Sequence, residues 1–279
     1  MNSSDSRSAT VIIEPVRGIR SLGLQDLWSA RELLYFMLWR DVKGNYRQMA
    51  FGPLWMLIQP LVMMLIFTGV FGTLANLPSE GVPYPLFTYV ALLPWQFFAT
   101  GTRQSAQSLV SQQSVISKVY FPRLIIPVSA VLAAFVDFLS SSVILIGMLL
   151  FYRVQIGWQV LAFPVFIVLA GATALTVGLW LAGLAVKYRD VLLGLGFLIT
   201  VWQYLTPVAY SATLIPEHLR SLYMLNPMAV TVQGFRWSLL GIGDPPGWPA
   251  AASGLLVTVL LLGGLITFRR TERTIVDLL

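Results

Sequence analysis

Six long apolar runs, separated by short charged segments, constrain the fold of this chain more than any other feature. The runs lie near residues 51–74, 84–102, 124–151, 158–185, 189–210 and 249–268. A helix needs about 20 apolar residues to cross roughly 30 Å of hydrocarbon. Only 11% of the residues are charged and 57% are hydrophobic, whereas a soluble domain carries about 25% charged residues. The sequence therefore predicts an all-α integral membrane protein with six transmembrane helices.

Several prolines lie inside these runs, among them those at positions 60, 94, 164 and 207. Proline removes a backbone donor and disturbs a helix. Within a membrane bundle, neighbouring helices can satisfy the freed carbonyls. We therefore expect kinks in these spans rather than breaks.

The Lys and Arg residues predict the direction of the spans. Of the 18, all but Arg153, Arg220 and Arg236 lie in the first fifty residues, in the loops 103–123 and 186–190, or after the last apolar run. Cytoplasmic segments carry the excess of basic residues in membrane proteins, so both termini are expected to be cytoplasmic. We see no signal peptide in the first fifty residues, because no early apolar run there precedes a small-residue cleavage site.

Residues 1–50 are predicted to form a cytoplasmic N-terminal segment, and residues 51–279 the transmembrane domain. Within the first segment, apolar side chains recur at helical spacing over 24–43, at Leu24, Leu27, Trp28, Leu34, Tyr35 and Leu38. Polar side chains occupy the other face, so we expect an amphipathic helix lying in the membrane interface. The alternative, a helix packed on a soluble domain, needs a domain that this chain lacks.

The external segment between spans five and six, residues 211–248, is predicted to be helical as well. Asn226-Pro227 supplies an N-cap followed by the preferred first helical residue. The side chains around it are largely apolar, and a surface loop would expose them all to water. We therefore expect a re-entrant hairpin of two short helices that dips back into the membrane.

The chain has no motif that could take energy from ATP. A phosphate-binding loop needs G-x-x-x-x-G-K-[ST], and the three lysines, Lys43, Lys118 and Lys187, follow Val, Ser and Val. An ion-coupled carrier usually has several ionisable residues at mid-membrane, and this chain has one, Asp137. It has no cysteine and one histidine, His218, which excludes a Cys/His metal site. We expect no cofactor in this chain, and a separate ATPase subunit bound to a cytoplasmic surface.

The cytoplasmic loop 103–123 is a candidate docking surface. It has three basic residues, no acidic residue and apolar side chains at helix-compatible spacing. These features fit a short amphipathic helix laid into a groove of a partner, and an ordinary solvated connector is the alternative.

The end of this loop, KVYFPRLIIP (Lys118 to Pro127), resembles a stretch in the membrane subunits of type-2 ABC transporters that export polysaccharides, the O-antigen, teichoic-acid and capsule permeases. Four further segments are similar to the same family in the same order. They are RDVKGNYRQMAFGPLWMLIQP (Arg40 to Pro60), PYPLFTYVALLPWQFF (Pro83 to Phe98), KYRD (Lys187 to Asp190) and LTPVAYSATLIPEHLRSLYMLNPMAVTVQGFR (Leu205 to Arg236).

The resemblance implies a homodimer of six-span subunits, paired with two copies of a separate ABC ATP-binding subunit that binds ATP and Mg. It implies that the loop between spans two and three is a coupling helix inserted into the ATPase, with the N-terminal interface helix beside it. Carried over to this sequence, the coupling residues are Arg40, Lys43, Gln112, Ser114, Lys118, Tyr120, Phe121 and Arg123. The helices expected near 216–223 and 227–240 would form an external gate.

A polymer in transit needs a wide conduit that binds each sugar weakly, and aromatic rings suit this because they offer flat apolar faces to sugar C–H groups. The candidate rings are Trp95, Phe97, Phe98, Trp202, Tyr204 and Tyr210. For any single ring, the interfacial aromatic belt is the alternative. Asp137, beside Ser140 to Ser142 in the third span, is the other candidate. We expect Asp137 to line a water-filled cavity or to pair with a substrate hydroxyl. The alternative is a hydrogen-bonded contact between helices.

The sequence therefore favours the membrane subunit of an ATP-driven exporter in the cytoplasmic (inner) membrane, moving an O-antigen-like, lipid-linked polysaccharide. A type-2 exporter of drugs or other small lipophilic molecules is the alternative. A membrane-embedded transferase needs clustered carboxylates, histidines or a metal, which one membrane aspartate does not supply. Despite the net charge of +6, no nucleic-acid partner is expected, because the basic residues lie between apolar runs rather than on one soluble face.

Overall fold

The structure, a computed structural model, describes residues 24–46, 54–116, 121–188 and 190–278. Its α-helices are α1 (Leu24–Ser29), α2 (Arg31–Tyr46), α3 (Leu54–Phe67), α4 (Tyr84–Ser111), α5 (Gln113–Ile116), α6 (Ile125–Phe151), α7 (Phe163–Lys187), α8 (Asp190–Tyr204), α9 (Glu217–Tyr223), α10 (Pro227–Leu240) and α11 (Trp248–Leu278). A π-helix, η2 (Thr68–Leu74), extends α3, and two 3₁₀ helices are η3 (Trp158–Ala162) and η4 (Ala212–Leu214). The described residues contain no strand, so the predicted all-α fold is confirmed.

In the part of the chain that the structure describes, four helical segments are long and apolar enough to cross a membrane. They are Leu54–Leu74, Ile125–Phe151, Trp158–Lys187 and Trp248–Arg269, and they coincide with four of the six predicted runs. The chain is thus an integral membrane protein. The helices in the other two runs, α4 and α8, depart from this pattern for different reasons.

α4 is the central helix of the bundle and packs against α3, α6, α7, α8 and α10. At 28 residues it is long enough to cross a membrane, but it includes more polar side chains than the other four segments. It also continues to Ser111, past the predicted end of the span at 102. The residues from Arg103 to Ser111 include neither Gly nor Pro, so nothing in them ends the helix.

α8 has only 15 residues and ends at Tyr204, whereas the sequence predicts a span to residue 210. Pro207 lacks a backbone N–H and disfavours helical geometry in the residue before it. The prediction that Pro207 only kinks this span is therefore wrong. α3 and α4 do continue through Pro60 and Pro94, and Pro164 lies in the first turn of α7, where proline is tolerated.

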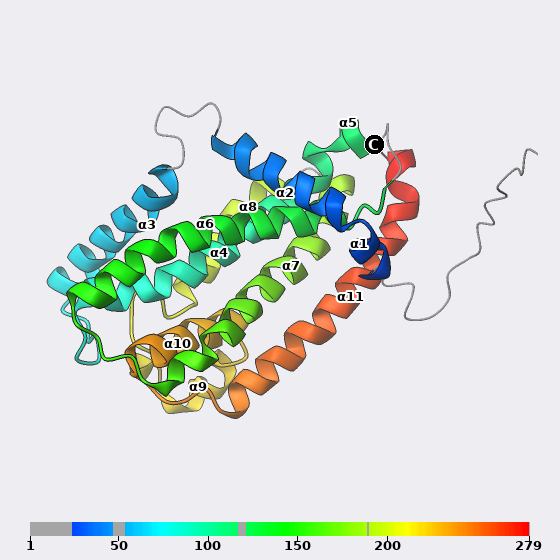
Figure 1. Ribbon diagram of the computed structural model, residues 1–279. Helices are drawn as coiled ribbons and strands as arrows, with labels where there is room; N and C mark the ends of the chain where they lie inside the picture. Colours follow the sequence, from blue (N-terminus) through cyan, green and yellow to red (C-terminus); the bar gives the residue numbers. More distant parts are fainter. Residues whose placement is uncertain (1–23, 47–53, 117–120, 189, 279) are drawn as a thin grey trace, which may run out of the picture.

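The helices form an elongated bundle with distinct ends (Figure 1). α1, α2 and α5 lie at one end, which we call the α5 end, and α9 and α10 lie at the opposite α10 end. α11 runs between them, starting beside α9 and finishing beside α5. The larger apolar core is centred on α4 and extends to α6, α7 and α10. A smaller core at the α5 end joins α2, α6, α7 and α11.

The predicted N-terminal amphipathic helix is divided into α1 and α2. α2 packs along α6 and buries Met37, with Leu33 and Leu34 against the same cluster. The large side chains that stay exposed are Trp28, Tyr35, Phe36 and Trp39. The segment is therefore apolar on two faces, one against the bundle and one directed outward.

The two helices expected in the external segment are both present, as α9 and α10. The side chain of Asn226 accepts a hydrogen bond from the N–H of Met228 at 3.0 Å, and Pro227 is the first residue of α10. The predicted N-cap is thus confirmed. Gly241 ends the helix with a φ of 66°, the left-handed conformation common at helix C-termini.

α10 packs closely on α7 through Gly234. A Cβ added at this glycine would lie 2.3 Å from the ring of Phe166, which is itself buried. Only a residue without a side chain fits at this contact, and this fixes how deeply α10 sits against the bundle.

Candidate functional site

A polar cavity of about 430 Å³ lies between α3, α4 and α6. Its polar lining consists of Gln59, Gln96, Thr100, Arg103, Gln104, Asp137 and Ser141. Apolar side chains, among them Trp55, Phe97 and Phe138, complete the wall. Two of the predicted path residues, Asp137 and Phe97, therefore lie on the same cavity.

Helical periodicity brings these polar groups together. The α4 residues are spaced at i, i+4, i+7 and i+8, so they form one stripe along the helix; they are Gln96, Thr100, Arg103 and Gln104. Asp137 and Ser141 are four residues apart on α6 and face the same cavity. Ionisable groups in a membrane bundle usually face its interior or a water-filled cavity. With one carboxylate and one guanidinium, this cavity offers hydrogen-bond acceptors and donors without a net charge.

Two hydrogen bonds join the three helices beside the cavity. The hydroxyl of Ser141 donates to the carbonyl of Met56 at 2.8 Å, and the hydroxyl of Tyr89 donates to the carbonyl of Ser141 at 2.9 Å. Both Ser141 and Tyr89 are buried, where an unpaired polar group would be costly. These bonds hold α3, α4 and α6 at a fixed separation along one side of the cavity.

The other predicted rings of α4 lie in the packed core of the single chain. Trp95 and Phe98 are buried, with ring centroids 5.3 Å apart. The ring of Phe98 also packs edge-on against Trp202 at 4.9 Å. Phe97 lies against Phe138 at 5.5 Å. A role for these rings in the path stays a prediction.

The remaining predicted rings gather beside the α9–α10 hairpin rather than at the polar cavity. The indole N–H of Trp202 donates to the side-chain oxygen of Asn226 at 3.0 Å. The hydroxyl of Tyr210 donates to the carbonyl of Tyr204 at 2.9 Å and also hydrogen-bonds the hydroxyl of Tyr223 at 2.9 Å. Burial, together with this last bond, raises the pKa of Tyr223 above its ordinary value, so the phenol stays neutral. The ring of Tyr204 itself is 62% exposed.

Arg236 belongs to α10 and is almost fully buried. From the sequence it could be identified only as one of the few basic residues in the predicted external segments. Its guanidinium donates to the carbonyl of Val208 at 2.9 Å and to that of Tyr210 at 3.2 Å. It also lies 3.5 Å from the ring centroid of Phe87. Burial lowers its pKa to about 9, while the Glu80 carboxylate acts in the opposite direction, so it is charged at neutral pH. It ties the segment after α8 to α10, a role that no local pattern could reveal.

A groove at the α5 end brings together predicted coupling residues from α2 and the loop after α4. Its volume is about 440 Å³, and its lining includes Arg40, Asp41, Gln104, Gln107, Ser111 and Gln112. We call it the α2–α4 groove. Arg40 forms an ion pair with Asp41 at 2.8 Å, and the hydroxyl of Ser129 on α6 donates to the other oxygen of Asp41 at 3.0 Å. The second of these contacts links α2 to α6 at the groove.

The other predicted coupling residues surround this groove less closely. Lys43 is exposed and its ammonium lies 6.0 Å from the Trp39 ring centroid. Ser114 is exposed on α5, Phe121 is buried and Arg123 is partly buried. Lys118 and Tyr120 fall outside the described residues. The short α5, rather than the whole loop, is the separate helix at this end, because α4 takes up the first part of the loop.

One residue is common to both sites. Gln104 lines the polar cavity and also the α2–α4 groove. The two sites are therefore adjacent along a single continuous helix, α4.

Apolar helices that enclose a polar cavity with ionisable lining residues are typical of multi-span membrane transport proteins. The chain belongs to the ABC-2 type transporter family, whose model matches residues 32–240. It is similar to the O-antigen export system permease protein RfbA of Myxococcus xanthus, with 29% identity over 242 residues, covering 85% of this chain and 92% of that protein. It is also similar to RfbA of Klebsiella pneumoniae, with 28% identity over 74% of this chain and 79% of that protein. The inner membrane transport permease YadH of Escherichia coli K12 is 25% identical over 78% of this chain and 87% of that protein.

Proposed function

We propose that this chain is the transmembrane subunit of an ATP-driven ABC transporter that exports a lipid-linked, O-antigen-like polysaccharide across the inner membrane. The observation that carries this proposal is the likeness to permeases named for O-antigen export, over 92% and 79% of their lengths. The polar cavity adds physical support, since its mixed donors and acceptors suit a hydroxylated substrate better than a purely apolar one.

α4 and α8 complete a set of six spans, with both termini in the cytoplasm. α4 is long enough to cross the bilayer, and its polar stripe faces the cavity rather than lipid. α8 covers only about 22 Å at 1.5 Å per residue. The non-helical residues after it, including Pro207 and Val208, are buried in protein, which is where irregular backbone is tolerated at membrane depth. The α5 end is then cytoplasmic, and the α9–α10 hairpin re-enters from the other side.

This topology can be tested cleanly because the chain has no cysteine. Single cysteines at Ser114 on α5 and at Gln155 in the loop after α6 are both placed at exposed positions. A membrane-impermeant maleimide should label Gln155→Cys in intact cells and Ser114→Cys only after permeabilisation. Labelling of Ser114→Cys in intact cells would reverse the orientation.

Two copies of the chain form the complete conduit, and two ATP-binding subunits dock at the α2–α4 groove and α5. The homodimer rests on the family resemblance; the exposed apolar side chains of α8, Leu193 and Phe197 at 82% and 72% in the single chain, would be covered by the second copy or by lipid. ATP and Mg are bound by the partner subunits, and Arg40 and Gln112 contact the partner. The exposed aromatic side chains of α1 and α2 lie in the membrane interface, where Trp and Tyr are favoured.

The decisive experiment uses the chain copurified with its ATP-binding subunit and reconstituted in lipid. ATP turnover is measured with added lipid-linked glycans and, in parallel, with small lipophilic drugs. Stimulation by glycans alone supports polysaccharide export. A stable complex that responds only to the drugs would assign the alternative, a type-2 exporter of small lipophilic molecules.

A further inference from the structure

A second cavity lies at the α10 end, between the α9–α10 hairpin and the loop that leads into α11. Its volume is about 280 Å³. We call it the hairpin pocket, and its main polar and aromatic lining residues are Glu80, Arg220, Gln233, Arg236, Asp244 and Trp248. None of the residues predicted to form the path lines it, so its chemistry is independent of the polar cavity.

The charges of the hairpin pocket balance. Arg220 and Arg236 supply two guanidinium groups, and Glu80 and Asp244 supply two carboxylates. Gln233 adds an amide that both donates and accepts. A pocket with this composition has no preference for an anion or a cation, but it can satisfy a ligand whose groups are donors and acceptors at once. Hydroxyl groups have this property.

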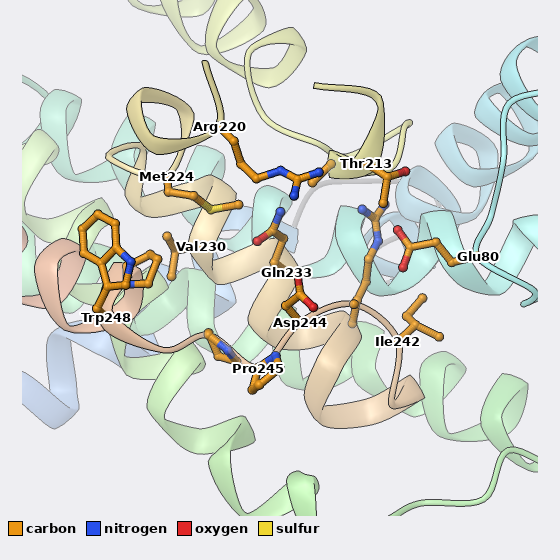
Figure 2. Close-up of a pocket in the computed structure, with 15 residues that line it drawn as sticks. Glu80, Thr213, Arg220, Met224, Val230, Gln233, Ile242, Asp244, Pro245 and Trp248 are labelled. Carbon is orange, nitrogen blue, oxygen red and sulfur yellow. The ribbon is translucent and has the colours of Figure 1, made fainter. Parts of the chain in front are cut away.

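The pocket also has an apolar side. Figure 2 shows Trp248, Met224 and Val230 together at the left of the view, with Arg220, Gln233 and Glu80 toward the centre and right. The indole of Trp248 is 66% exposed and is therefore accessible to a ligand. A ring with hydroxyl groups at its edge and C–H groups on its face matches both sides, because the C–H face packs on the indole while the edge reaches the charged groups.

The polar side is held in place by contacts between distant segments. Glu80 accepts a hydrogen bond from the hydroxyl of Ser211, and its backbone adopts a φ of 55°, which is uncommon for a residue other than glycine. The guanidinium of Arg236 is fixed by two carbonyls, and its Nε, which is buried, has no hydrogen-bond partner among the described residues. The φ of Glu80 belongs to the turn that the Val82 N–H and the Ser79 carbonyl close at 3.1 Å, so the unpaired Nε of Arg236 is the feature that calls for a further partner, a water or a ligand.

On the basis of the export function proposed above, we propose that the hairpin pocket binds one uncharged pyranose unit of the exported polysaccharide. Its volume is near the lower end of the range for small-molecule pockets, about 300–1,000 Å³, so it accommodates a single ring rather than a length of chain. Trp248 contacts the face of the ring, and Asp244 and Arg220 hydrogen-bond its hydroxyls.

Saturation-transfer NMR on the full chain in phosphatidylcholine nanodiscs tests this directly. Alkyl glycoside detergents are avoided, because their headgroups would compete. The probes are methyl α-mannoside and methyl α-galactoside, with glucuronate as the charged counterpart. Saturation transfer to at least one neutral glycoside is expected. The affinity for that glycoside should be weaker by about tenfold or more in Asp244→Ala and in Trp248→Ala, since each substitution removes a main contact of the ring. Arg236 is left intact because it also holds the fold.

Matched controls remove similar side chains outside the pocket. Trp158→Ala removes an exposed tryptophan, and Asp190→Ala an exposed aspartate; both should bind the glycoside as the wild type does. Absence of transfer to either neutral glycoside, transfer to glucuronate alone, or equal transfer in the pocket variants would overturn the assignment. Export by the reconstituted complex is measured separately. Normal glycan-stimulated turnover without binding at this pocket refutes the pocket and leaves the export function standing.

Discussion

Arg236 offers the sharpest test of how the structure is held together, because a single side chain joins α10 to the segment after α8. Replacing it by methionine keeps most of the apolar stem and removes the guanidinium. The carbonyls of Val208 and Tyr210 then lose their donor, at about 1–3 kcal/mol for each buried group left unpaired. The contact with the Phe87 ring contributes about 0.5–2 kcal/mol more.

Removal of the guanidinium also removes the cost of burying its charge, which offsets part of this loss. We expect a net destabilisation of about 3 kcal/mol, or roughly 6–12 °C in the melting temperature on the scale of soluble domains. Thermal unfolding in nanodiscs, followed by tryptophan fluorescence, measures the shift. Arg236→Lys should fall between wild type and Arg236→Met, because lysine keeps the charge but not the two-pronged geometry.

The matched control is Arg153→Met, at an exposed arginine after α6, which should melt within about 1 °C of wild type because surface substitutions change stability little. An unchanged melting temperature in Arg236→Met would show that the two carbonyl contacts do not stabilise the fold. Equal losses of melting temperature in Arg236→Met and Arg236→Lys would show that the two-pronged geometry of the guanidinium stabilises the fold and that its charge does not.

Three further substitutions test separate contacts. Asp137→Ala should lower polysaccharide export on the order of tenfold, by removing the one carboxylate that the described residues place in the polar cavity, while dimer assembly measured by cross-linking stays normal; unchanged export at normal expression would refute a role in the path. Gly234→Ala should destabilise the chain by about 1–3 kcal/mol through its overlap with Phe166, whereas Gly147→Ala, with open space around it, should be neutral or slightly stabilising in the same melting assay. Asn226→Ala should cost about 1 kcal/mol as a lost N-cap and about 1–3 kcal/mol more for the Trp202 indole N–H left without its acceptor, and hydrogen exchange should rise at the first turn of α10; unchanged exchange there would contradict the capping role.

The helices could be predicted from the sequence where the signal is local. The apolar run 124–151 gives α6 almost to the residue, and Asn226-Pro227 gives the start of α10. The ends of α4 and α8 could not be placed as well, since hydropathy marks where a chain is apolar and not where a helix stops. In α8 the decisive feature is Pro207. Whether a proline kinks or ends a helix depends on whether neighbouring groups can hydrogen-bond the backbone carbonyls that it leaves unpaired.

The polar cavity was only partly predictable. Asp137 is conspicuous in an apolar span, because a membrane carboxylate is costly, but its neighbours Gln59 and Arg103 come from other helices. Which stripe of α4 faces α6 is set by tertiary packing. Arg236 shows the same limit: its contacts with Val208 and Tyr210 depend on a chain reversal that no periodicity records. The proposed roles of the aromatic rings stay predictions, since a single chain does not show which surfaces two copies would share.

The continuity of α4 has a mechanical consequence. Gln104 belongs to the walls of both the groove and the cavity, and no hinge residue separates it from Ser111 at the end of the helix. Gln104 and Ser111 are about 10 Å apart along one uninterrupted α-helix, so we expect a displacement of the Ser111 end to move Gln104 with it. In the transporter proposed above, a displacement of the partner subunit at the α2–α4 groove would therefore reach the polar cavity through the backbone of α4 itself, without a relay of side chains.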